Sequence, residues 1–437
     1  MNAITPPLHR GMIELERSVF KKVINTLAIK VPVKQIGLAK KSFANDLFNQ
    51  PRLRNVEPDP SSKETKLVLL NLDLQKADDL PKEKLDLLKQ HEWSLVQHDM
   101  ELNYDFWTAE QIFHSVMPED STDIPASFTQ VGHIAHMNLR EHYYPWKNLI
   151  GQVILDKNKN ITTVVNKTNS IDTTFRFFKM EILAGKNDMI AEVKESGCKF
   201  KFDFSKVYWN SRLHTEHDRL VQLFKPNEFV CDVFAGVGPF ALPAAKKGSI
   251  VYANDLNPSS YEYMKENIKY NKINSGIFPY NMDGRAFIRQ AVKDLQATSK
   301  NEWKTFDHFV MNLPATAIEF LDAFRGLYQD QKDLFNTSAR AKLPMIHCHC
   351  FTKSTDAMQD ISERVGQIMG SKPDISKSSV HWVRNVAPKK DMYCISFPLS
   401  SDIAFAATPV SHNNSEKRKL EDATPSTLEA QKAPRIE

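Results

Sequence analysis

The stretch that decides the fold is Cys231-Asp-Val-Phe-Ala-Gly-Val-Gly-Pro-Phe240, followed after a short helical segment by Val251-Tyr-Ala-Asn-Asp-Leu-Asn-Pro258. The first segment predicts a buried strand ending in a glycine turn that opens a helix, and the second predicts the next strand. Gly236 and Gly238 carry no Cβ, so the backbone can pass close to a ligand. Asp255, at the tip of the second strand, is placed to accept hydrogen bonds from ribose hydroxyls. The pattern predicts a site for an adenosine-containing cofactor.

The glycine turn favours S-adenosylmethionine over other adenosine cofactors. A dinucleotide fingerprint needs three spaced glycines, but here Pro239 and Phe240 follow Gly238 and no third glycine arrives. No Lys-Ser/Thr pair follows the turn, which excludes a P-loop. The alternative is an ordinary tight turn between a strand and a helix.

Composition places the chain among soluble globular proteins. Its 437 residues predict two or three domains, with 41% hydrophobic and 25% charged residues. There is no apolar run of about eighteen residues, so we expect no membrane span. A net charge of +4 permits a polyanionic partner. Five scattered cysteines indicate a reducing compartment rather than a disulfide framework, and we expect no secretory signal peptide.

The first half of the chain predicts two α+β regions. Residues 1–110 combine a helical pattern from Met12 to Leu27 with a strand at 66–73. In residues 111–220 the sequence pattern instead predicts short strands separated by turns. Those strands are expected at 151–156, 162–165 and 199–204.

The second half predicts a doubly wound parallel sheet, because strands and helices alternate over residues 221–400. Strands are expected at 229–233, 250–254, 277–281, 307–311 and 344–350, with helices between them, including one after Pro258 and one from Asp356 to Met369. Residues 380–384 and 392–397 are joined by a short loop, so that pair must be antiparallel. An α/β sheet that finishes in such a hairpin is the usual class I (Rossmann-like) methyltransferase core. Residues 401–437 are poor in apolar side chains and predict a disordered tail.

Ligands of open α/β sheets lie beyond the carboxyl ends of the strands. Asp283 follows the third strand, where a carboxylate can accept the adenine amino group, and Asn312 with Pro314 follows the fourth. Asn312 resembles the first residue of the Asn/Asp-Pro-Pro-aromatic tetrapeptide of amine methyltransferases, but the departure at Leu313 favours a ring nitrogen deprotonated by a separate base. The alternative for Asn312 is a helix N-cap.

Upstream of the sheet, Thr215 is expected to start a helix with Glu216 in its first turn. The positive helix end lowers the pKa of such a carboxylate whereas burial raises it, and the sequence leaves open which effect is larger. The alternative is an exposed, well-placed first-turn acid.

Several motifs in order resemble the archaeal and eukaryotic tRNA (guanine-37-N1)-methyltransferases. They are Gly132-His-Ile-Ala-His-Met-Asn-Leu-Arg140, Phe175-Arg176 with Glu181-Ile-Leu-Ala-Gly185, Val207-Tyr-Trp-Asn-Ser-Arg-Leu213, Thr215-Glu-His217, Phe234-Ala-Gly-Val-Gly-Pro-Phe240 and Asn312-Leu-Pro314. The match runs from about residue 90 to 400. The resemblance implies methyl transfer from S-adenosylmethionine to N1 of guanosine 37, next to the anticodon of tRNA.

The resemblance also implies roles for individual residues. Glu216 matches the general base, Arg176 an arginine that stabilises the transferring state, and Asn312 the asparagine that holds the guanine edge beside Pro314. Tyr208 matches an aromatic side chain that packs on the flipped base. Cofactor contacts are implied for His217, Phe234, Gly236, Asp255, Leu256, Asp283, Gly284 and Asn312. His217 stands where archaeal members carry arginine.

Partners and compartment follow the same resemblance. We expect tRNA to be read by the upstream domains, through Lys40, Lys41, Arg52, Arg54 and the Lys389-Lys390 loop. We expect a monomer without an obligatory protein partner, present in the cytoplasm, nucleus and mitochondrial matrix, with Lys417-Arg418-Lys419 as a minimal nuclear signal.

The sequence has three other interpretations. An aminocarboxypropyl transferase of the wyosine pathway has a related core and uses the same cofactor. A non-catalytic tRNA-binding module is the alternative outside enzymes. His347-Cys-His-Cys350 contains metal-ligand residues, but on a strand the two histidines face one way and the two cysteines the other, so we predict no metal site there.

Overall fold

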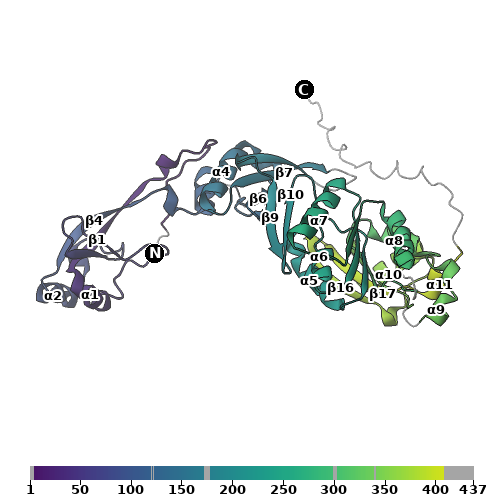
Figure 1. Cartoon of the computed structure of the whole chain (residues 1–437). Coiled ribbons are helices and arrows are strands. Elements are labelled where there is room, and N and C mark those ends of the chain that lie inside the picture. Colours follow the sequence, from purple (N-terminus) through teal and green to yellow (C-terminus); the bar gives the residue numbers. More distant parts are fainter. Residues whose placement is uncertain are drawn as a thin grey trace, which may run out of the picture. The chain divides into compact units, whose positions relative to one another are not determined.

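The computed structural model describes residues 4–119, 121, 123–171, 178–298, 303–338 and 341–407. The chain divides into two compact units, Met1–Arg212 and Leu213–Glu437. Figure 1 traces both units along the colour gradient from purple to yellow.

The first part of unit 1 is a four-stranded antiparallel sheet, in the order β2-β3-β1-β4. Its elements are β1 (Lys22–Pro32), α1 (Ile36–Ser42), β2 (Val56–Pro58), β3 (Thr65–Leu69), α2 (Lys82–Gln90) and β4 (Ser94–Leu102). The helix predicted from Met12 to Leu27 is wrong, because this segment contains a short 3₁₀ turn and then most of β1. β-branched side chains at Val23, Ile24 and Thr26 fit a strand better than a helix.

The second part of unit 1 contains a sheet in the order β5-β6-β7-β8 and a separate hairpin of β9 and β10. Its elements are α3 (Ala109–Val116), β5 (Thr129–Val131), β6 (Ile134–Met137), α4 (Lys147–Lys157), β7 (Thr163–Ile171), β8 (Phe178–Gly185), β9 (Ile190–Glu195) and β10 (Cys198–Asp203). The strand predicted at 151–156 is wrong, because these residues belong to α4. Gly151 allows α4 to pack closely on β8, since a Cβ there would lie 2.5 Å from Leu183 Cβ.

One hydrophobic core joins the two parts of unit 1. Phe20, Met100 and Trp107 from the first part share it with Ile150 and Val164 from the second. The residues on the two sides of the domain boundary expected at residue 110 therefore share one core. That boundary remains a prediction.

Unit 2 is built on a seven-stranded sheet in the order β13-β12-β11-β14-β15-β17-β16. Its strands are β11 (Phe229–Asp232), β12 (Ile250–Asn254), β13 (Ile277–Tyr280), β14 (His308–Met311), β15 (Met345–Thr352), β16 (Ser379–Ala387) and β17 (Lys390–Pro398). β11 to β15 are parallel, and β17 and β16 form the antiparallel end of the sheet. The predicted strand alternation and the closing hairpin are confirmed.

Helices cover both faces of this sheet. They are α5 (His214–Leu223), α6 (Ala241–Lys246), α7 (Pro258–Tyr270), α8 (Gly284–Thr298), α9 (Leu334–Thr337), α10 (Ala357–Met369) and α11 (Ser401–Ala404). The core cluster on one face joins α8 and α10 to Cys231, Cys348 and Cys350 of the strands. His349, one residue away along β15, bonds instead to Glu216 of α5, so α5 lies on the opposite face.

The fold continues beyond residue 400. Residues 401–404, which the sequence places in the tail, form α11, and Ile403 and Ala404 are buried in the core of unit 2. The basic run at 417–419 lies outside the described residues. Within the described part of the chain, no helix is both long and apolar enough to cross a membrane.

Candidate active site

The glycine turn after β11 lies at the carboxyl end of the sheet, and its two glycines leave the backbone there without side chains. Gly236 has φ +56° and Gly238 has φ +98°, a region that side chains with a Cβ rarely adopt. At Gly238 a Cβ would also lie 2.2 Å from Leu242 Cδ1, so the leucine side chain would have to move. A Cβ at Gly236 would project into open space, with no atom within 4 Å. The turn therefore leaves a gap that a ligand can enter.

Asp255 follows β12 and faces this turn. Its two carboxylate oxygens accept backbone hydrogen bonds from Gly236 and Asn257, each at 2.9 Å. Each oxygen can accept a second hydrogen bond, as a ribose diol would require. Burial raises the pKa of Asp255 to about 6.

A buried asparagine that the sequence analysis missed ties three strand tips together. The Asn254 amide donates to the carbonyls of Val233 and Met282, and its Oδ1 accepts from the Met282 N–H at 2.9 Å. Its position directly before Asp255 was the one sequence signal that could have indicated Asn254.

The loop between β13 and α8 carries the next predicted cofactor residues. Asp283 is exposed, and its Oδ1 accepts from the backbone N–H groups of Arg285 and Ala286 at the start of α8. Gly284 is buried against Phe234, whose ring atom Cε1 would lie 2.9 Å from a Cβ. This close contact explains why glycine stands at position 284.

Asn312 follows β14, and its side chain is not a helix cap. The next helical turn, Ala317–Phe324, has Thr316 at its N-cap position. Asn312 Oδ1 is buried and has no hydrogen-bond partner among the described residues. Pro314 accepts from the Phe351 N–H through its carbonyl, at 3.2 Å, which ties the loop to β15. The alternative of a simple capping residue is therefore excluded.

Asp232, the last residue of β11, is a second buried acceptor at this edge, and the sequence analysis did not single it out. The residue is fully buried, and neither carboxylate oxygen has a well-aligned partner in the described part of the chain. Burial, and then the charge of Asp255, raise the pKa of Asp232 to about 8. An unpaired buried acid is costly, so the residue fits a cationic ligand.

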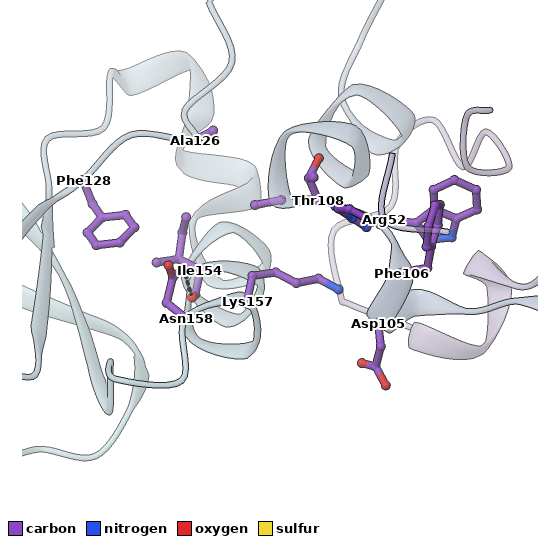
Figure 2. A pocket seen from close by; sticks show the side chains of 11 residues that line it. Arg52, Asp105, Phe106, Thr108, Ala126, Phe128, Ile154, Lys157 and Asn158 are labelled. Carbon is purple, nitrogen blue, oxygen red and sulfur yellow. Dashed lines mark hydrogen bonds between the residues drawn. The ribbon is translucent and has the colours of Figure 1, made fainter. Parts of the chain in front are cut away.

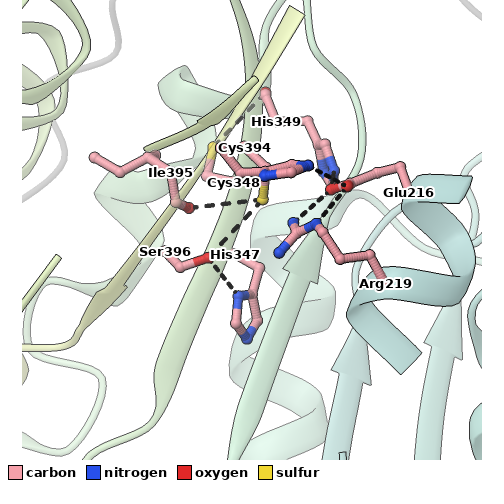
Figure 3. Close-up of polar contacts among 9 residues, drawn as sticks. Glu216, Arg219, His347, Cys348, His349, Cys394, Ile395 and Ser396 are labelled. Carbon is pink, nitrogen blue, oxygen red and sulfur yellow. Dashed lines mark hydrogen bonds and ion pairs between the residues drawn. The ribbon is translucent and has the colours of Figure 1, made fainter. Parts of the chain in front are cut away.

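Glu216 lies where the sequence predicts, in the first turn of α5, and it is only 3% exposed. Both oxygens contact Arg219, with Nε to Oε2 at 2.6 Å and Nη2 to Oε1 at 2.7 Å. The buried His349 contacts Oε1 through Nε2 at 2.7 Å. Figure 3 shows these groups meeting between α5 and β15.

The structure decides in which direction the pKa of Glu216 is shifted. Burial acts to raise the pKa of Glu216, but hydrogen bonds from Arg219 and then His349 outweigh it and lower that pKa to about 2. Burial likewise disfavours a charged His349, yet Cys394 and Glu216 raise its pKa to about 10. The acid is therefore an ionised, buried carboxylate and not an exposed surface group. The sequence analysis considered His349 only as a metal ligand, and it assigned no role to Arg219, because their contacts with Glu216 depend on the fold.

The strand register brings His349, which holds this acid, close to the end of β14. In the parallel pair β14–β15, Val310 is opposite His347 and Met311 is opposite Cys348. Asn312 directly follows β14 and His349 is the next residue of β15, and neighbouring strands lie about 4.8 Å apart. His217, beside Glu216, is buried with its ring edge-on to Phe240 at 4.7 Å.

The remaining predicted site residues are Arg176, Tyr208 and Leu256. Arg176 lies outside the described residues. Tyr208 is in unit 1 and is 48% exposed, with its hydroxyl 3.4 Å from the Asn210 amide. Leu256 follows Asp255 and is 47% exposed.

The predicted alternation along His347–Cys350 is confirmed. Cys348 and Cys350 lie in the core on the α8 face, and His349 points to α5 on the other. Among the described residues, one group could offer ligands to a metal ion, namely Glu216, His349 and Cys394, whose ligand atoms lie within 4.8 Å of one another. The Arg219 guanidinium already supplies a cation to that group.

Unit 1 carries a separate basic hollow of about 540 Å³ (Figure 2). Arg52 lies over the Phe106 ring at 4.8 Å, and its own φ of +68° is unusual for a residue with a side chain. Lys157 lines the same hollow, and burial lowers its pKa. The remaining lining residues are Asp105, Trp107, Thr108, Ala109, Ala126, Phe128, Ile154 and Asn158.

The sheet order, the glycine turn and the carboxylate after β12 define unit 2 as a class I methyltransferase domain. In agreement, the family model of the TRM5/TYW2 methyltransferase domain matches residues 191–333, and that of the TYW2 N-terminal domain matches residues 109–188.

Similar proteins of known activity narrow this class. The chain is 48% identical to a tRNA (guanine(37)-N(1))-methyltransferase of Batrachochytrium dendrobatidis, over 92% of this chain and 91% of the relative. It is 46% identical to the enzyme of the same name in Schizosaccharomyces pombe, over 91% and 96% of the two chains. The chain belongs to the tRNA (guanine-37-N1)-methyltransferase family, and S-adenosylmethionine is its methyl donor.

Solved structures share the fold. Trm5b of Pyrococcus abyssi is 25% identical, with a TM-score of 0.57 over 85% of this chain and 99% of that one. The aTrm5 chain of a complex with tRNALeu has a TM-score of 0.62 at 21% identity, over 86% and 100% of the two chains.

Proposed function

We propose that Glu216 is the general base that removes the N1 proton of guanosine 37 during methylation. The observation that carries this assignment is a buried, ionised carboxylate on α5 that is bonded to His349, the residue of β15 directly after the one paired with the end of β14. N1 of guanine carries a proton at neutral pH and is a poor nucleophile until the proton leaves, so a positioned carboxylate acts directly on the methyl-transfer step.

The residues divide the reaction between them. As the N1–H bond breaks, the proton passes to a Glu216 oxygen and the electron pair stays on N1, which attacks the methyl carbon. S-adenosylmethionine supplies that methyl group on a sulfonium, which leaves as a neutral thioether. We assign Asn312 to the guanine edge because its buried Oδ1 has no partner within the described structure. Arg176 is assigned to the negative charge that develops on O6, by resemblance alone.

Observations on the strand tips support the proposed cofactor contacts. Asp255 has acceptor capacity for ribose hydroxyls, and Gly236 leaves open space beside it. Gly284 and Phe234 form a close-packed wall nearby, where the adenine ring is proposed to lie. Asp232 is added to the residues expected from sequence, as the group that would face a positive charge of the cofactor.

The direct test uses transcripts of tRNA with guanosine or adenosine at position 37. We expect incubation with methyl-labelled S-adenosylmethionine and digestion to nucleosides to give labelled 1-methylguanosine from the first transcript only. Label from the carboxyl carbon of the cofactor should stay out of the RNA. Carboxyl label in the RNA would instead establish the aminocarboxypropyl alternative, and no label with folded protein would establish the non-catalytic one.

We also propose that the hollow around Arg52 and Lys157 contacts the tRNA body. Two cations and the Phe106 ring suit a phosphate and a base, because base stacking on aromatic rings and charge neutralisation drive RNA binding. The double variant Arg52→Gln with Lys157→Gln should raise KM for full-length tRNA about tenfold in low salt. Its rate on an isolated anticodon stem-loop should be unchanged. Equal effects on the two RNAs would show that the hollow does not contact the tRNA body. Lys63→Gln, which changes another exposed residue of unit 1, is the matched control.

A further inference from the structure

The Glu216 carboxylate is fully engaged in this structure. Three short contacts reach its two oxygens, two from Arg219 and one from His349 (Figure 3). Hydrogen bonds between charged groups are roughly twice as strong as neutral ones. A carboxylate held in this way is precisely oriented but is a weak proton acceptor.

The two partners of Glu216 differ in their freedom to move. His349 sits within β15, its side chain is 0% exposed, and it can leave only if the sheet deforms. Arg219 lies one turn further along α5, and its side chain is 28% exposed. Part of its long side chain already faces solvent, so it can rotate outward without deforming the sheet. Arg219 is therefore the partner that can be released.

If Arg219 moves away, one of the two Glu216 oxygens becomes free. Oε2 contacts Arg219 alone among the short contacts, whereas Oε1 also contacts His349. When Arg219 leaves, Oε1 remains bonded to His349 and Oε2 becomes free. A general base works best when its proton affinity matches the operating pH, and loss of the guanidinium moves Glu216 in that direction.

The other groups that face Glu216 come from two further strands. His381 of β16 lies 3.7 Å from Oε2 through Nε2, and its side chain is 46% exposed. Cys394 of β17 is buried beside His349 and Arg219. Burial, and then the charge of Arg219, lower the pKa of His381. At neutral pH, the cations held directly against the carboxylate are therefore Arg219 and His349.

We infer that His349 is the fixed positioning residue of Glu216 and that Arg219 is a releasable one, whose departure frees Oε2 to accept the N1 proton. The inference rests on the proposed role of Glu216 as the base. Arg219 thus keeps the buried charge paired while the site is empty, and His349 keeps the carboxylate aimed once guanine replaces the guanidinium.

A double-mutant cycle tests the role of His349. Single-turnover methyl transfer is measured for the wild type, His349→Ala, Glu216→Gln and the double variant, at saturating tRNA and cofactor. We expect His349→Ala to lower the rate about 30-fold, which is less than the roughly 100-fold or larger loss expected for the base itself. The loss should be less than about twofold when Glu216 is already glutamine. If His349→Ala does not fold, His349→Gln takes its place in the cycle, since it removes the charge but keeps a nearby N–H donor.

Each outcome of the cycle has a distinct meaning. Equal losses from the His349 change in both backgrounds would show that His349 acts on the fold and not through Glu216, and would overturn the inference. A Glu216→Gln enzyme as fast as the wild type would instead refute the proposed base.

The pH dependence tests the role of Arg219. The profile of kcat/KM reports the free enzyme and that of kcat reports the substrate complex. In the wild type, the Arg219 contacts keep Glu216 ionised, so kcat/KM should show no acidic limb from this group above pH 5, whereas kcat should show one. In Arg219→Gln, the acidic limb of kcat/KM should rise to coincide with that of kcat.

Control variants separate this result from general effects. Lys225→Gln removes an exposed charge just beyond the C-terminal end of α5 and should leave both profiles in place. His381→Gln tests whether the observed limb belongs to His381, in which case it would vanish in that variant and the inference would fail. An Arg219→Gln enzyme whose kcat/KM profile keeps the wild-type shape would also overturn it. Arg219→Lys, which keeps a charge without the two-point contact, is the substitute if Arg219→Gln does not fold.

Discussion

Glu216→Gln should lower the single-turnover rate of methyl transfer about 100-fold or more, on the scale expected for the loss of a general base. Glutamine keeps the size of the side chain but cannot accept the N1 proton at neutral pH. Binding of tRNA and of S-adenosylmethionine should change less than about threefold, because the base acts in the transition state and not in the bound ground state.

This substitution also disturbs the fold, and the experiment must account for that. The glutamine amide leaves Arg219 and His349 without a carboxylate, and breaking a buried ion pair costs about 3–5 kcal/mol; the partial exposure of Arg219 makes the lower end the better expectation. Asp218→Asn removes the same charge from an exposed position of the same helix and should leave the rate unchanged. If Glu216→Gln, folded and binding both substrates, transfers methyl groups at the wild-type rate, Glu216 is not the base.

Asp232→Val should have opposite effects on the cofactor-free protein and on cofactor binding. Without cofactor, Asp232 is a buried acid with no well-aligned partner among the described residues, so its replacement by an apolar side chain of similar size should raise the free energy of unfolding by about 1–3 kcal/mol. The affinity for S-adenosylmethionine should fall about 10- to 100-fold, which corresponds to the loss of one hydrogen bond to a charged group. Thermal unfolding with and without cofactor, together with calorimetry, measures both effects.

The pH dependence of this variant has a definite sign. In the folded protein the pKa of Asp232 is raised from 3.8 to about 8. Its contribution to stability is therefore complete below pH 3.8 and is lost as the pH rises through 8. The stability advantage of Asp232→Val should grow over that interval, and cofactor binding by the wild type should release a proton below pH 8.

Asp232→Asn separates charge from shape in the same experiment. It should bind the cofactor as weakly as Asp232→Val, without proton release. Wild-type cofactor affinity in either variant would show that Asp232 does not face the cofactor's positive charge.

The sequence predicted unit 2 well because its signals are local. The glycine turn, the alternation of strands with helices and the short loop before β17 each act within a few residues. It misjudged two segments of unit 1 for the same reason. Residues 151–156 are apolar enough for either a strand or a helix, and close packing of Gly151 on β8 decided for a helix. The first strand was mistaken for a helix because pairing with β3 and β4 is invisible in the local pattern.

For the site too, local features could be predicted from the sequence and contacts between distant segments could not. The sequence by itself determined which residues stand at the strand tips and at the start of α5, because a turn, a cap and a strand end are set by neighbours along the chain. Only the tertiary structure decided that Glu216 is buried, ionised and held by Arg219 and His349. It also decided that Asp232 and Asn312 have buried acceptor oxygens without a well-aligned partner in the described part of the chain. Desolvation and ion pairing depend on groups brought together from distant segments, such as residues 216 and 349, and no local pattern records that meeting.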